Sequence, residues 1–152
     1  MINSSFRWFL LCLATTGLGQ AQQALCPKHI EAPTYPQLAR QAMLAGKVVL
    51  TLALDAEGKV ESVAATTDNS QLLKVPVLQK SAVENIKHWI FAKPPSIPFT
   101  QVIIYDYEFD ASLPGDDGAN PISKVTFDLP DRVTVLANFR LVETQGIKTE
   151  RR

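Results

Sequence analysis

The chain has 152 residues, of which 46% are hydrophobic and 20% are charged, as expected for one small globular domain. Basic and acidic residues are balanced at 15 each. That balance argues against a nucleic-acid binder, which would carry a basic excess.

Residues 1–21 have the pattern of a secretory signal peptide. Arg7 precedes the apolar run 8–14, and small residues follow up to Ala21. The alternative is an uncleaved inner-membrane anchor at residues 6–19, although a span needs about 20 apolar residues. We therefore expect export to the periplasm. Cleavage would leave Cys26 as the sole cysteine, with no internal disulfide and with its role left open.

Residues 22–33 read as an extended leader, because they contain prolines and show no hydrophobic period. A first helix is predicted to begin at Tyr35-Pro36, since proline suits the first helical turn. Gly46 is predicted to end that helix in the left-handed conformation.

Alternating hydrophobic residues then predict a β-hairpin. The strand 47–54 is followed by a turn at 55–58 with Asp and Gly, and by a second strand at 59–66. The alternation slips between Val60 and Val63, which predicts a bulge.

A polar connection at 68–74 leads into a second predicted helix at 76–89, which a proline-rich stretch ends. A third strand is predicted at 99–109, with odd-numbered residues on one face and even-numbered residues on the other. The first strand would lie at the centre of the sheet and the third at an edge, with both helices on one face.

The remainder is predicted as a loop at 111–122, a C-terminal β-hairpin at 123–142 and a frayed tail at 143–152. The sequence leaves open whether this hairpin pairs with the third strand. If it does, a partner could dock only on a new edge provided by the hairpin.

Four pieces of this pattern occur together in order: Tyr35-Pro36, Gly46-Lys47-Val48, the turn at 55–58, and Trp89-Ile90-Phe91. Together they resemble the C-terminal domain of TonB over about residues 33–109. The resemblance implies an α+β domain at 34–110 with a three-stranded antiparallel sheet and two helices on one face, to which the C-terminal β-hairpin is added.

The resemblance also implies a role. Domains of this family grip the plug end of outer-membrane transporters, whose extended segment adds as a strand to the sheet edge. Carried onto this sequence, the partner-binding residues would be Tyr35, Pro36, Gln101, Val102, Ile103, Ile104, Tyr105, Asp106 and Tyr107.

Three departures from the family point to a stand-alone module and not to an energy transducer. The N-terminal apolar segment is shorter than the family's membrane helix and lacks the polar residues with which that helix meets its motor complex. The leader could extend over only about 45 Å, far less than the family's proline-rich spacer. Ala32-Pro33 also stands where the family has Gln-Pro before the tyrosine.

No catalytic, cofactor or metal site is predicted. His29 lies in the leader and His88 at the end of the second predicted helix, so they do not form a ligand pair at metal spacing. Asp116-Asp117 lacks the further ligands of a Ca²⁺ loop. Trp89 and Phe91 are interpreted as core anchors.

The leading hypothesis is therefore a periplasmic module that binds an outer-membrane transporter or another envelope protein, linked to TonB-dependent transport. The alternative is a structural or assembly protein that forms a homodimer edge to edge. The edge hypothesis also predicts that Ile104→Pro would abolish binding and spare the fold.

Overall fold

The computed structural model describes residues 23–113 and 123–138. The predicted signal peptide, the acidic pair at 116–117 and the C-terminal tail lie outside these residues. The described elements are β1 (Pro27–His29), α1 (Gln37–Gln41), β2 (Gly46–Leu54), β3 (Val60–Thr66), α2 (Ser70–Lys74), α3 (Val77–Ile86), β4 (Ile90–Phe91), β5 (Phe99–Phe109), β6 (Ser123–Asp128) and β7 (Arg132–Ala137).

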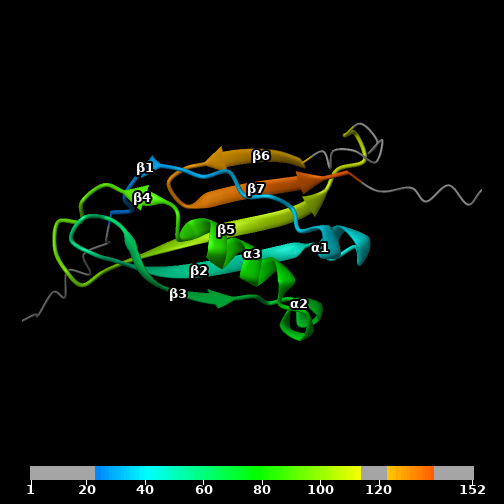
Figure 1. Ribbon diagram of the computed structural model, residues 1–152, viewed down its shortest axis with the longest axis horizontal. Helices are drawn as coiled ribbons and strands as arrows, with labels where there is room; N and C mark the ends of the chain where they lie inside the picture. The colour runs from blue at the N-terminus through cyan, green and yellow to red at the C-terminus, as the bar shows by residue number, and fades with distance from the viewer. Residues whose placement is uncertain (1–22, 114–122, 139–152) are drawn as a thin grey trace, which may run out of the picture.

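The architecture is one five-stranded sheet in the order β3-β2-β5-β7-β6, accompanied by the small pair β1-β4 (Figure 1). All neighbours are antiparallel except β5 and β7, which run parallel. The central position of β2 between β3 and β5 confirms the predicted order of the first three strands.

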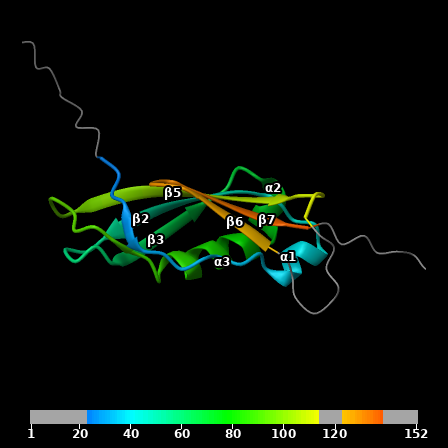
Figure 2. The same cartoon turned by 90° about the horizontal axis from the view of Figure 1, so that it is seen from above.

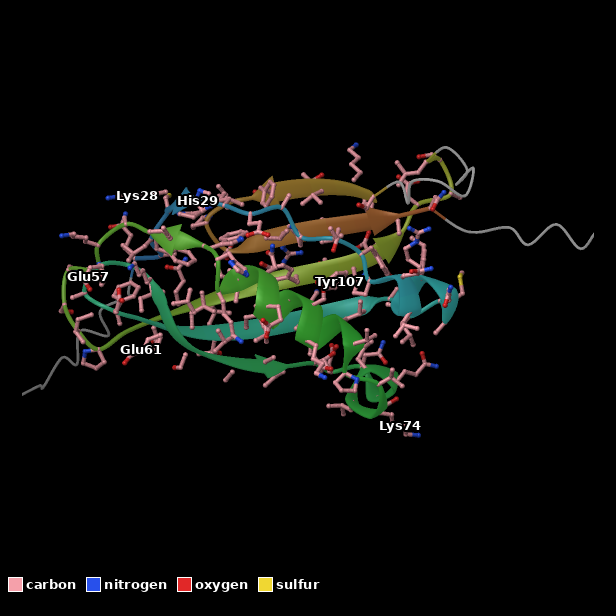
Figure 3. The ribbon with its side chains drawn as sticks, in the orientation of Figure 1. Lys28, His29, Glu57, Glu61, Lys74 and Tyr107 are labelled. Atoms are coloured by element: carbon pink, nitrogen blue, oxygen red, sulfur yellow. The ribbon has the colours of Figure 1, made fainter. Side chains whose placement is uncertain are left out.

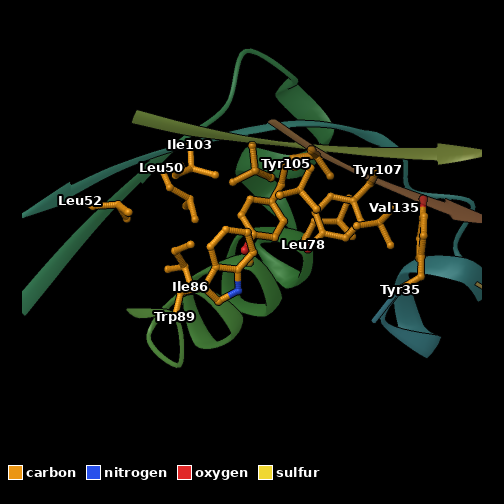
Figure 4. Close-up of a cluster of buried hydrophobic side chains, with 14 of the residues drawn as sticks. Tyr35, Leu50, Leu52, Leu78, Ile86, Trp89, Ile103, Tyr105, Tyr107 and Val135 are labelled. Carbon is orange, nitrogen blue, oxygen red and sulfur yellow. The ribbon is translucent and has the colours of Figure 1, made fainter. Parts of the chain in front are cut away.

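The core lies between the sheet and α3, and Figure 2 shows α3 and α1 on the same side of the sheet. Alternate residues of β2 and β5 turn inward, because successive side chains of a strand point to opposite faces. Figure 4 shows the result around Trp89, which packs with Tyr105 and Ile86 beneath Leu50 and Ile103.

Two strand predictions are confirmed in detail. The first hairpin pairs β2 with β3, and its register shifts between Ala53 and Leu54, so that Glu61 is the extra residue of a bulge. In β5 the odd-numbered side chains from 99 to 107 are buried, whereas Val102 and Glu108 on the other face are exposed.

The expected sheet of three antiparallel strands with an appended hairpin is wrong. β6 and β7 do pair with each other in antiparallel fashion, but β7 also pairs with residues 104–109 of β5. The strand 99–109 is therefore an interior strand of a mixed sheet. The side chains of Val133, Val135 and Ala137 are fully buried, so this pairing closes the core.

The prediction that Gly46 ends the first helix is wrong. The chain leaves α1 through Met43, which has a φ of 51°, and Gly46 with a φ of 148° is the first residue of β2. Glycine is required there for a second reason as well. A Cβ would lie 3.0 Å from both Asn69 Nδ2 and Leu72 Cδ1.

The polar connection at 68–74 contains a helix that the sequence analysis missed. Asn69 accepts a hydrogen bond from the Gln71 N–H and so begins α2, which buries Leu72. The next helix, α3, begins near the predicted position but ends at Ile86, three residues earlier than predicted. No helix among the described residues is long and apolar enough to cross a membrane.

Candidate functional site

Tyr35, predicted to lie near a partner, is part of the core. Its side chain is only 5% exposed, and its hydroxyl donates to Leu44 O at 2.6 Å. Its ring meets the ring of Tyr107 edge to face, with 5.4 Å between the centroids. Pro36 is half-buried at the start of α1. These contacts give the Tyr-Pro pair a structural role in fixing the first helix to the sheet.

The predicted residues on β5 divide by face. Ile103, Tyr105 and Tyr107 are buried in the core, whereas Val102, at 46% exposed, lies on the face away from the helices. Ile104 and Asp106 share that second face and are partly buried. Side chains on the core face are not accessible to a partner without unfolding.

The backbone of β5 is closed on the side where a partner strand was expected. The Ile104 N–H donates to Asp131 O at 2.7 Å, and the Asp110 N–H donates to Ala137 O at 2.8 Å. Between these bonds β7 runs parallel to β5. The prediction that Ile104→Pro would spare the fold is therefore wrong, because this N–H has an internal acceptor.

The first residues of β5 extend beyond β7 and are covered differently. Gln101 is 4% exposed, and its side-chain amide holds the backbone of Leu25: it accepts from the Leu25 N–H and donates to the Leu25 carbonyl, both at 2.9 Å. It also reaches Pro130 O at 3.4 Å. The side-chain amide of Gln101 thus pairs with the N–H and C=O of Leu25, as the backbone of a neighbouring strand would.

The described part of the leader, residues 23–33, is docked on the domain, which could not be predicted because these residues show no hydrophobic period. β1 pairs with β4 near one end of the sheet. Further on, the Glu31 carbonyl accepts from Trp89 Nε1 at 3.0 Å and from Asn85 Nδ2 at 2.9 Å. Side chains of α3 and of the turn after it therefore hold the leader in an extended path.

The open edge on this side of the sheet is β6, not β5. Odd-numbered residues of β7 direct their N–H and C=O toward β5, so even-numbered ones face β6. The register places Thr134 opposite Thr126 and Leu136 opposite Lys124. The odd-numbered residues of β6 therefore point outward, where no described strand meets them (Figure 1). These residues are Ser123, Val125 and Phe127.

The opposite edge, β3, is less accessible. The Phe91 N–H donates to Gly58 O at 2.8 Å, and Lys59 bridges to Ile90, so β4 covers the beginning of this edge. The bulge at Glu61 interrupts the edge directly afterwards, and Figure 3 shows Glu61 beside the start of β3. Bulges and charged residues are common means of blunting an edge strand.

Charges alternate across the outer face near β6. Arg132 on β7 lies 3.3 Å from Asp106 on β5, measured between Nη1 and Oδ2. Asp128 on β6 lies directly opposite Arg132 in the ladder. Lys124, at the other end of β6, is exposed. The edge strand thus carries one cation and one anion, four residues apart on the same face.

In the part of the chain that the structure describes, the other polar groups form no arrangement that suggests catalysis. His88 Nδ1 lies 3.7 Å from a Glu31 carboxylate oxygen at the rim of a surface pocket of about 230 Å³, and both side chains are well exposed. Within residues 23–113 and 123–138, no group of three His, Cys, Asp or Glu could hold a metal ion. Cys26 is exposed and is not in a disulfide.

Comparison with known families matches residues 31–109 to the family described as the Gram-negative bacterial TonB protein C-terminal. The match begins in the docked leader and ends at the last residue of β5. It excludes β6 and β7. A search among curated proteins finds no match to the chain.

Proposed function

Because this chain belongs to the family of TonB C-terminal domains, we propose that it is a periplasmic docking module of the cell envelope. In this proposal an extended segment of a partner protein adds as a strand to the sheet, as the sequence resemblance implied. The partner would be an outer-membrane transporter or another envelope protein, and the module would act without catalysis.

The observation that carries the proposal is the open edge of β6. Its backbone N–H and C=O groups at Val125 and Phe127 face outward, and β7 is its only neighbour in the described part of the chain. An added strand gains main-chain hydrogen bonds from such an edge and is selected by the side chains that flank it. We therefore transfer the docking role from β5, whose edge β7 occupies, to β6.

The flanking side chains support selection as well as affinity. Phe127 remains 36% exposed next to the edge, and Leu129 is exposed at the end of the strand. On the outer face, Lys124 and Asp128 offer one charge of each sign. A matching peptide would place an apolar residue next to Phe127 on the face that the helices cover. On the outer face it would place an acidic residue near Lys124 and a basic residue near Asp128.

The test is titration of the purified chain with synthetic peptides that copy the plug-end segments of TonB-dependent transporters, followed by fluorescence anisotropy. Val125→Pro should weaken binding by about tenfold or more, because it removes an outward donor and places a ring at the edge. The ladder between β6 and β7 should persist, since Val125 takes no part in its hydrogen bonds.

Ala65→Pro is the matched control. By the same alternation, Ala65 turns its N–H outward on β3, so the substitution blocks the other edge in the same way. Binding should be unchanged in this variant. Equal loss in both variants, or no loss in Val125→Pro, would contradict docking at β6.

A further inference from the structure

We propose that the edge of β6 also accepts a second copy of this chain, with β6 pairing antiparallel to its counterpart around a two-fold axis at Thr126. This inference rests on the proposed role of β6 as a docking edge. Pairing of the two β6 strands would join two five-stranded sheets into one continuous sheet. An envelope peptide and the second copy would then compete for the same edge.

The register follows from which residues point outward. In a two-fold antiparallel pair, outward-facing residues must lie opposite one another to exchange hydrogen bonds. An axis at Thr126 places Val125 opposite the partner's Phe127, and both face outward. It also places Lys124 opposite the partner's Asp128 on the outer face, and the symmetry repeats each pair.

The charges on the outer face are complementary in this register. Within one copy, Asp106, Arg132 and Asp128 form a row of alternating sign that runs across β5, β7 and β6. The next position in that row lies beyond the edge. The partner's Lys124 fills it with a cation, at the short Cβ separation of pairs directly opposite in a sheet.

The inner face is complementary in shape and polarity. The ring of Phe127 has its centroid 6.0 Å from that of Trp89, yet 36% of the residue is exposed. Val125 is partly buried beside it and packs against the core. In the dimer, the partner's Val125 covers the exposed part of Phe127, which removes apolar surface from water.

Neighbouring registers lose these matches. A shift by two residues sets Thr126 opposite either Lys124 or Asp128, so Lys124 and Asp128 no longer face each other across the interface. The β3 edge offers no equivalent pairing, because its bulge at Glu61 interrupts the outward-facing series. The sequence of β6 therefore favours one register over the alternatives.

The experiment is light scattering of the purified chain across a concentration series, with charge-reversal variants. We expect a dimer for the native chain. Lys124→Asp and Asp128→Lys should each raise the dimer dissociation constant by about tenfold, since two symmetric pairs become like-charged at once. An equal mixture of these two variants should restore the dimer, because each copy then opposes the other's charges correctly.

Asp128→Lys places a cation opposite Arg132 in its own hairpin, so Val125→Pro serves as a second variant that changes no charge and should also be monomeric. Circular dichroism of each variant verifies that it is folded. A monomeric native chain, a dimer that both variants leave intact, or failure of the mixture to recover the dimer would overturn the proposal.

The two proposals fail in different ways. A native chain that is monomeric and still binds transporter peptides contradicts self-pairing alone. A native dimer that binds no transporter peptide, even at concentrations at which light scattering shows it dissociated, contradicts docking alone. If both proposals hold, added peptide should shift the native chain from dimer to monomer.

Discussion

Three tyrosines, Tyr35, Tyr105 and Tyr107, place their hydroxyl groups inside the core. Burial raises the pKa of each above its ordinary value, and the neighbouring Tyr107 adds to the rise at the other two. For Tyr107 itself, burial raises the pKa to about 12, and the nearby Ser81 hydroxyl acts in the opposite direction. These hydroxyls are therefore held neutral where unfolded tyrosines would ionise.

The free energy of unfolding should decrease as the pH rises above about 10. In the unfolded chain a tyrosine loses its proton near pH 10, whereas folded Tyr107 keeps it to about pH 12. The stabilisation is complete below pH 10 and is lost between these values, by about 1.4 kcal/mol per pH unit for each such tyrosine. Urea unfolding at pH 9 and pH 11 measures it, and Tyr107→Phe should flatten the dependence. A slope unaltered by that substitution would contradict this assignment.

At the scale of elements, the main feature is the parallel pairing of β7 with β5. It occupies the side of β5 to which Ile104 and the following even-numbered residues direct their N–H groups, the side that the family resemblance assigned to a partner. Sequence periodicity could not reveal this, because alternation predicts that a strand has two faces but not which strand becomes its neighbour.

Ile104→Pro and Val102→Pro should behave differently, although both residues lie on the same side of β5. The first substitution removes the bond from Ile104 N–H to Asp131 O, whereas Val102 lies before the first residue that pairs with β7. We expect Ile104→Pro to reduce the free energy of unfolding by about 3 kcal/mol and Val102→Pro to reduce it far less. Chemical denaturation of both variants measures the difference, and equal losses would show that β7 does not fix this strand.

The alternation of hydrophobic and polar residues correctly predicted the strands whose two faces differ in burial. The alternation from 47 to 66 and from 99 to 109 correctly indicated three strands, and the slip at Val60 correctly indicated the bulge. The helix after Asn69 is too short to show a period. The leader has no period either, since what holds it is a set of hydrogen bonds from distant residues such as Gln101 and Trp89.

The candidate site, too, was predictable only in the part that depends on the local sequence pattern. The family pattern correctly indicated the domain, and it implied docking at a sheet edge. It could not indicate that residues outside the pattern occupy the expected edge. Alternating residues correctly predicted the hairpin from 123 onward. Docking at its outer edge depended on whether the hairpin pairs with the strand 99–109, which alternation alone could not decide.

For the whole molecule, the family match and the folded unit differ in extent. The match ends at residue 109, yet β7 contributes three fully buried residues to the core. Removing the hairpin would expose the backbone of β5 together with apolar surface of Trp89, whose ring packs near Phe127. The hairpin is therefore an integral part of the fold.

A chain that ends after Leu113 should unfold at lower temperature than one that ends after Asn138, and it should self-associate through the uncovered β5. The longer chain keeps every described strand and serves as the control. Thermal denaturation and sedimentation velocity measure the two effects. A shorter chain with the same melting temperature as the control would show that the domain is complete without its hairpin.

The docked leader has a mechanical consequence for the place of the domain in the envelope. From Leu25 onward the chain is fastened to the sheet and to α3, so none of this segment is free to serve as a tether. Between the predicted apolar segment at 6–19 and Leu25 there are only five residues, which can span at most about 20 Å. If residues 6–19 stay in the inner membrane, the domain is confined to that membrane's surface. If the predicted cleavage after residue 21 occurs instead, the domain is no longer held at that surface.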